Sequence, residues 1–380
     1  MKALNRRDFL KTSGAAAIFA ATPGLAYSQV VGGAGPFDDY RALVCVFLFG
    51  GNDSFNMLVP NTPAEYNAYA TSRQNLAIAQ GDLLPITPAS SSAPDFGLHP
   101  AMSGVQSLFN SGEAAFVVNV GPLVEPTTRD QFLNGSVTLP PQLFSHNDQQ
   151  DQWTSLRGNV PSKTGWAGRM ADLIRTGVTE QQMATNASLF GANLFQSAEE
   201  TVAYVMGPNG PLQFEGFSTD PNSILFEQRE AFRRVVQAQY DTVYERGFAE
   251  VQQRAIDSAD TVTAAIDAAP PLNTVFPQSQ LGTQLQTVAR LVAVRDRLQM
   301  KRQVFFVATG GFDTHDNQNQ DQPGLLGGVS DAIAAFHAAT VELGVADSIT
   351  TFTQSDFGRT LTSNGDGTDH AWGGNQLVVG

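Results

Sequence analysis

The sequence predicts an α/β fold built on a largely parallel sheet. Three apolar runs, at residues 43–49, 304–308 and, more loosely, 349–353, have the length and composition of strands buried on both faces. Apolar residues also recur at helical spacing over residues 325–343, between the second and third runs. A strand, a helix and a strand in this order predict two parallel neighbouring strands joined by a right-handed crossover.

An aspartate follows each apolar run within a few residues: Asp53, Asp313 and Asp356. Glycine pairs at residues 50–51 and 310–311 follow the first two runs, and paired glycines allow a sharp turn or a close approach to a ligand. Ligands of open parallel sheets bind just beyond the carboxyl ends of the strands. We therefore expect three carboxylates to gather at one edge of the sheet.

Residues 1–26 have the features of a twin-arginine signal peptide. Arg6 and Arg7 precede a short apolar stretch at residues 15–21 and small residues at 24–26. We expect the twin-arginine export machinery to recognise this segment and the protein to be periplasmic or secreted. The apolar stretch is shorter than the ~20 residues that span a bilayer, and no later stretch reaches that length, so no stable membrane span is expected.

The chain is strongly acidic. It has 22 Lys and Arg against 36 Asp and Glu, and removal of residues 1–26 leaves 18 against 35, a net charge of about −17. A nucleic acid would require a basic face, so no nucleic-acid partner is expected. The single cysteine, Cys45, lies in the first apolar run, which excludes an internal disulfide.

The remaining patterns add helices, a strand and an insertion. A helical pattern over residues 98–109 precedes an apolar run at residues 114–120. Residues 180–300 carry long helical patterns and no chemical motif, so we interpret them as a helical insertion that covers the sheet or caps the site. We expect His99, before a proline, and His337, beside an apolar helical stripe, to be structural.

Ser145 and His146 lie in a polar segment at the start of a predicted helix. The free backbone N–H groups of a helix start favour an anion, so Ser145 is a candidate to hold a phosphate or sulfate oxygen. An N-cap role for Ser145 fits equally well. His146 is a candidate ligand or proton carrier, although a single histidine in a polar loop is a weak signal.

A polar, glycine-rich loop at residues 365–374 carries Asp369 and His370. Carboxylate and imidazole groups bind zinc or manganese, and glycines let a loop wrap around an ion. Together with His315, which follows the second predicted strand, this loop predicts a site for a divalent metal ion. Zinc and manganese are the first candidates, calcium is a further one, and a purely structural loop is the alternative.

These residues resemble domain-of-unknown-function family 1501, twin-arginine-exported bacterial proteins placed in the alkaline phosphatase and sulfatase superfamily. The resemblance covers nearly all of residues 40–380 and rests on FGGND at 49–53, LHP at 98–100, SH at 145–146, TGWAGR at 164–169, FDTH at 312–315, SDFGRT at 355–360 and TDH at 368–370. It implies an alkaline phosphatase-like, three-layer α/β/α sandwich with a metal site at the strand ends. Such proteins continue past the last loop, so we expect a C-terminal part to be missing after Gly380.

The resemblance also implies site residues. One metal ion would be held by Asp313, His315 and His370. A second would be held by Asp53 and Asp356, with Ser145 as the nucleophile. Two features depart from the superfamily pattern, because Asp313 and His315 stand unusually close in sequence and Phe357 replaces the histidine expected after Asp356.

The function that these residues indicate is an exported, metal-dependent hydrolase of phosphoric or sulfuric esters. Its substrate would be a small anionic ester, Ser145 would be the nucleophile and Ser54 the next candidate, and Arg359 could clamp the oxyanion because guanidinium binds phosphate and sulfate bidentately. The alternative is a catalytically inactive metal-binding scaffold that acts through a partner protein, and Phe357 favours it.

Overall fold

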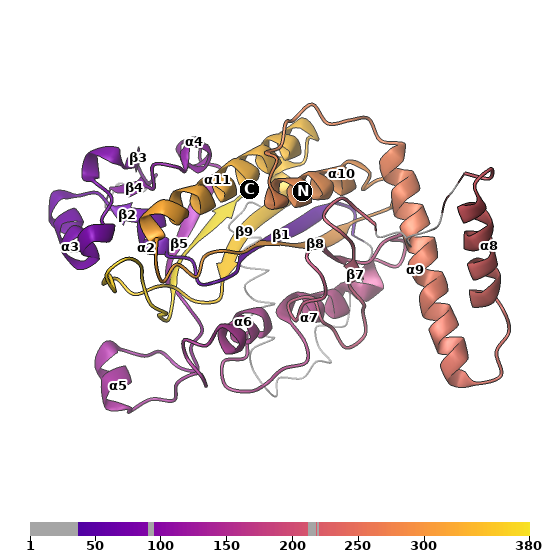
Figure 1. Cartoon of the computed structure of the whole chain (residues 1–380), viewed down its shortest axis with the longest axis horizontal. Helices are drawn as coiled ribbons and strands as arrows, with labels where there is room; N and C mark the ends of the chain where they lie inside the picture. The colour runs from indigo at the N-terminus through magenta and orange to yellow at the C-terminus, as the bar shows by residue number, and fades with distance from the viewer. Residues whose placement is uncertain (1–36, 90–94, 212–217, 219) are drawn as a thin grey trace.

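The structure is a computed structural model that describes residues 37–89, 95–211, 218 and 220–380. The predicted signal peptide, residues 1–26, lies outside the described residues. The described part is a mixed α/β fold around a seven-stranded, largely parallel sheet, as the sequence predicts (Figure 1).

The seven strands run in the spatial order β5-β10-β9-β1-β8-β6-β7. Their bounds are β1 Arg41–Leu48, β5 Ala114–Val120, β6 Asn186–Ser188, β7 Tyr204–Val205, β8 Arg302–Thr309, β9 Ile349–Ser355 and β10 Gly374–Val379. β10 is antiparallel to both neighbours, and the pairs among β9, β1, β8, β6 and β7 are parallel. A small antiparallel sheet in the order β2-β4-β3 is made of β2 Leu58–Pro60, β3 Leu84–Ile86 and β4 Phe96–Leu98.

The predicted strands all form, but the expectation that the strands flanking residues 325–343 are neighbours was wrong. β8 and β9 are parallel, yet β1 lies between them and pairs with both. β5 does not approach β1, because β10 and β9 separate the two. β1 takes the central place because it is buried along almost its whole length, and a strand covered on both faces gains most from two strand partners.

Helices cover both faces of this sheet (Figure 1). The α-helices of the described residues are α2 Ser54–Met57, α3 Pro63–Arg73, α4 Ser103–Asn110, α5 Arg129–Asn134, α6 His146–Ser155, α7 Trp166–Ile174, α8 Ile224–Val236, α9 Val243–Asp267, α10 Gln280–Ala293 and α11 Gln318–Glu342. The predicted helix at 98–109 begins later, at Ser103, because Leu98 belongs to β4.

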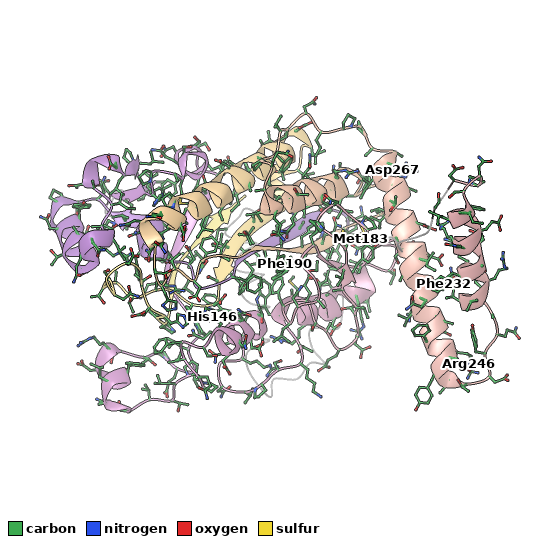
Figure 2. The ribbon with its side chains drawn as sticks, in the orientation of Figure 1. His146, Met183, Phe190, Phe232, Arg246 and Asp267 are labelled. Carbon is green, nitrogen blue, oxygen red and sulfur yellow. The ribbon has the colours of Figure 1, made fainter. Side chains whose placement is uncertain are left out.

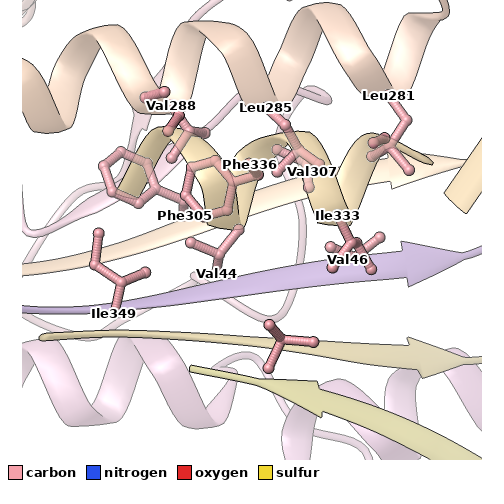
Figure 3. Packing of buried hydrophobic residues seen from close by; sticks show 14 of the residues in the cluster. Val44, Val46, Leu281, Leu285, Val288, Phe305, Val307, Ile333, Phe336 and Ile349 are labelled. Carbon is pink, nitrogen blue, oxygen red and sulfur yellow. The ribbon is translucent and has the colours of Figure 1, made fainter. Parts of the chain in front are cut away.

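The main core lies between the sheet and α10 and α11. Alternate residues of β1 and β8, such as Val44 and Phe305, meet Leu285 of α10 and Phe336 of α11 (Figure 3). The intervening residues of the same strands point to the other face and pack against α7, where Phe306 belongs to a second cluster. The two-residue period of a strand therefore explains why both faces of the central strands are apolar.

The segment predicted as a helical insertion, residues 180–300, is not purely helical. It supplies β6 and β7 to the sheet, and α10 packs in the main core. α8 and the first part of α9 project from the body at the right of Figure 1, where Figure 2 labels Phe232 of α8 and Arg246 of α9. The last turns of α9 pack in the main core through Val262, Ala265 and Ile266. Arg229 and Arg233 of α8 form ion pairs with Asp260 of α9, which tie the two helices together.

α11 has the length and composition of a membrane-spanning helix, with a mean hydropathy of 1.3 over its most apolar window, contrary to the expectation that no later stretch would. Half of that window is buried inside the protein. Leu326, Ile333 and Phe336 pack in the main core, so α11 serves here as a core helix.

Candidate metal centre

The candidate metal centre lies at the carboxyl edge of the large sheet, where the loops after β1, β8 and β9 meet. Gly50 and Gly51 turn the chain after β1 with φ values of 119° and 83°. A Cβ on Gly50 would lie 2.4 Å from the backbone N of Asp313, so only glycine allows these two loops to approach so closely. The N–H of Gly50 donates to Asp356 over 3.2 Å, which joins the third loop.

Three histidines surround the carboxylate of Asp313. His146 opens α6 (Figure 2), His315 follows β8, and His370 lies in the loop before β10. Their Nε2 atoms lie 3.4, 3.1 and 3.2 Å from Asp313 oxygens, and those of His315 and His370 are 2.9 Å apart. His146, Asp313 and His370 each offer one ligand atom within 4.8 Å of the others, which is close enough to hold one metal ion.

The opposite ring nitrogens of the same histidines all contact oxygen acceptors. The Nδ1 distances are 2.6 Å from His146 to Asp356, 3.2 Å from His315 to Asp369 and 2.7 Å from His370 to the carbonyl oxygen of Phe144. Because a carbonyl or carboxylate oxygen accepts, each Nδ1 donates. A ring that is neutral then has its lone pair on Nε2, where an ion could bind, whereas a protonated ring donates its Nε2–H to Asp313. Acceptors behind histidine ligands fix ring orientation in this way at known metal sites.

Asp356 supports His146 from a fully buried position. Its Oδ2 accepts from His146, from the backbone of Gly50 and, over 3.1 Å, from Gln150. Its Oδ1 is buried and has no hydrogen-bond partner among the described residues. Asp356 therefore orients a histidine of the group and keeps one carboxylate oxygen unused.

Arg359 is fully buried beside Asp313. Its guanidinium donates to the carbonyl oxygens of Gly50, Gly51 and Thr368 over 2.6 to 2.9 Å, and it forms an ion pair with Asp313. The side chain therefore ties three loops together, and most of its N–H groups already have acceptors.

The charge state of Asp313 follows from these neighbours. Desolvation raises the pKa of its carboxyl group, but the hydrogen bond and charge of Arg359, with smaller contributions from His370 and His146, lower the pKa by more. The net pKa lies below its ordinary value, so Asp313 is a carboxylate at neutral pH.

Phe357 occupies the place where the resemblance implies a histidine. Its ring is buried and packs 4.8 Å from the ring of His146 and 4.4 Å from that of His370, measured between centroids. It thus supports two histidines by packing and offers no ligand atom.

Asp53 has a different set of partners. It is buried, forms an ion pair with Arg73, and accepts from Gln318 over 2.5 Å and from the backbone of Phe55 over 3.2 Å. Its role as a metal ligand stays a prediction, because Arg73 competes with any ion for this carboxylate.

The two candidate serine nucleophiles differ in their surroundings. Ser145 is the N-cap residue of α6, directly before His146, but its hydroxyl donates to Asp148 over 2.6 Å and accepts no hydrogen bond from the helix backbone. Ser54 is buried, and its hydroxyl accepts from the backbone N–H of Asn375 over 2.7 Å. Ser145 is therefore the more accessible of the two.

The match to known families covers most of the chain. A family model described as "Protein of unknown function (DUF1501)" matches residues 40–380. The chain belongs to this family. No curated protein matches the chain.

In this DUF1501 protein, the remaining two histidines are placed as the sequence predicts. His99 is buried, and its Nδ1 accepts from the backbone N–H of Ala101 over 3.1 Å, which is a loop-capping contact. His337 lies on α11, outside the histidine group.

Sequence reasoning placed Asp313, His315 and His370 together but gave His146 little weight. The tandem of Ser145 and His146 at a helix start was the available signal. Gln150 was missed altogether, because its only mark in the sequence is the i, i+4 spacing to His146, which puts both side chains on one face of α6.

Proposed function

We propose that this chain is an exported, metal-dependent hydrolase of phosphoric or sulfuric esters with an alkaline phosphatase-like, three-layer arrangement. One observation carries the proposal. Three histidine Nε2 atoms converge on the ionised Asp313, and each ring is held from behind by an acceptor at Nδ1. Three lone pairs that face one carboxylate form a donor set for a divalent cation.

The donor set favours a borderline metal ion. Imidazole nitrogen suits zinc and related transition metals, whereas calcium and magnesium prefer oxygen ligands. His146, Asp313, His315 and His370 would hold the ion, with zinc or manganese as the first candidates. A bound ion would supply positive charge to polarise the ester and to stabilise charge developing on its oxygens.

The protein groups have separate roles in this proposal. Arg359 holds Asp313 in place, and Asp356 and Asp369 keep the lone pairs of two histidines directed at the centre. Ser145 is the proposed nucleophile, and Asp148 is the proposed acceptor of its proton because the two side chains are hydrogen-bonded.

Metal content tests the centre directly. Protein expressed with its export signal should contain about one divalent ion per chain, and His146→Ala, His315→Ala and His370→Ala should each lose it. His337→Ala is the matched control, because this histidine lies outside the group, and it should keep the ion. Elemental analysis that finds no metal in the wild-type protein would refute the centre.

Activity tests the reaction. The metal-loaded protein should hydrolyse an aryl phosphate or aryl sulfate, and Ser145→Ala should lower the rate by orders of magnitude because it removes the nucleophile. Ser136→Ala, at an exposed serine of the neighbouring loop, is the control. Equal rates for these two variants would exclude Ser145 as the nucleophile.

A metal-binding scaffold is the second candidate, and two contacts favour it. The N–H groups of Arg359 are largely used inside the protein, so this residue has little left for an oxyanion. Phe357 brings no ligand where the superfamily pattern expects a histidine. A metal-loaded protein without any serine-dependent esterase activity would support the scaffold.

A further inference from the structure

The charges around the candidate metal centre can be counted from its contacts. Asp313 contacts all three histidines, Asp356 supports His146, and Asp369 supports His315. These carboxylates contribute three negative charges. Among the described residues, Arg359 is the one Lys or Arg side chain within ion-pair distance of them.

One divalent ion would bring this group to electrical neutrality. Arg359 and the ion contribute three positive charges, the carboxylates three negative charges, and histidines that give their Nε2 lone pairs to an ion are neutral. Asp148, hydrogen-bonded to Ser145, adds a further negative charge beside the proposed nucleophile. The loaded centre therefore has no surplus positive charge for a doubly charged anion.

The rest of the protein does not restore a positive field. The formal net charge of the chain is −14, so its long-range field opposes the approach of any anion, and a dianion twice as strongly as a monoanion. Arg359 cannot turn toward a substrate without giving up its contacts to Gly50, Gly51 and Thr368 in the interior.

Resting on the proposed hydrolase function, we infer that the substrate is an ester with a single negative charge on its acid group. Sulfate monoesters and phosphodiesters have this charge. A phosphate monoester does not, because its second pKa near 6 makes it largely a dianion above neutral pH. The balance of charges at the centre thus selects among the esters that the metal centre could accept.

Binding of two non-hydrolysable anions tests this inference without relying on turnover. Benzenesulfonate is a monoanion, and phenylphosphonate is predominantly a dianion at about pH 8 with the same ring and a tetrahedral acid group. Calorimetric titration of zinc-loaded full-length protein should give benzenesulfonate the lower Kd, by about tenfold. Rates for an aryl sulfate and a diaryl phosphate, each compared with an aryl phosphate, then distinguish the two monoanionic classes.

Two variants shift the charge balance by one unit in the same direction. Asp369→Asn removes a negative charge but keeps an oxygen acceptor for His315, and Gln150→Lys adds a positive charge beside Asp356. Both should lower the Kd of phenylphosphonate relative to that of benzenesulfonate. Asp366→Asn, in the same loop but bonded to the backbone of Asn317, is the control and should leave the ratio unchanged.

The possible results distinguish a failure of the inferred monoanion preference from a failure of the proposed hydrolase function. Tighter binding of phenylphosphonate by the wild-type protein would overturn the inference and leave the hydrolase proposal standing. Binding of neither anion to protein shown to contain metal would overturn both. A ratio that moves equally in Asp366→Asn would show that net charge, and not the centre, sets the preference, which also overturns the inference.

Discussion

Replacement of Arg73 by methionine should destabilise the protein strongly. The guanidinium of Arg73 is fully buried, forms an ion pair with the buried Asp53 and donates to the carbonyl oxygen of Thr360 over 3.0 Å. Arg73→Met leaves the Asp53 carboxylate buried with only Gln318 and a backbone N–H as donors. Breaking a buried ion pair by removing one partner costs about 3–5 kcal/mol of unfolding free energy.

Urea unfolding followed by tryptophan fluorescence measures this loss, since the chain has three tryptophans. The double variant Asp53→Asn/Arg73→Met should be more stable than Arg73→Met alone, because it leaves no unpaired buried charge. Arg41→Met is the control, because Arg41 and Asp39 are 38% and 55% exposed, and a surface pair contributes only about 0–1 kcal/mol.

A loss of less than about 1 kcal/mol of unfolding free energy in Arg73→Met would show that the buried ion pair contributes no more than a surface pair. A double variant that loses the sum of the two single losses would show that Asp53 and Arg73 are not coupled. If added zinc raises the stability of Arg73→Met more than that of the wild-type protein, Asp53 accepts an ion once Arg73 is gone.

Two further predictions concern His99 and Gly51. Burial lowers the pKa of His99 to about 4, so its neutral form stabilises the fold above about pH 6.5 and this stability is lost as the pH falls toward 4. Between about pH 7 and 5 the wild-type protein should lose about 2 kcal/mol more unfolding free energy than His99→Asn, and equal losses would contradict the shift. Gly51→Ala should cost about 2–4 kcal/mol and weaken metal binding, because the new Cβ would meet the Phe357 ring at 2.2 Å in a backbone with φ of 83°. Gly328→Ala should be neutral or stabilising in the same denaturation experiment, because Gly328 is helical and the new Cβ would meet no atom within 4 Å apart from the backbone of its own helix.

The strands were predictable because their signal is local. Residues 43–49 and 304–308 are continuous apolar runs, and a strand buried on both faces has that composition wherever it pairs. Strand order was not predictable from such runs. The insertion of β1 between β8 and β9 depends on contacts between residues more than 250 positions apart, of which a single sequence holds no record.

The same division applies to the candidate metal centre. Asp313 and His315 were predictable as site residues because they follow a predicted strand within a few positions. His370 was predictable because it lies in a glycine-rich acidic loop. His146 comes from a helix that reaches the centre only through tertiary packing, and its link to Asp356 spans 210 positions. The ion pair between Asp53 and Arg73 could not be predicted from the sequence either, because Arg73 is on α3, which lies outside the large sheet and packs near the end of β1.

The position of the histidines along the chain has a consequence for folding entropy. His315 and His370 are 55 positions apart, and His146 lies on a helix far earlier in the chain. An ion shared by these side chains would close long loops and restrict the unfolded chain, as a disulfide does for about 2–4 kcal/mol in other proteins. With Cys45 as its one cysteine, the chain has no disulfide to perform this task. The metal-bound histidine group would thus act as a cross-link between distant parts of a chain that has no disulfide cross-link.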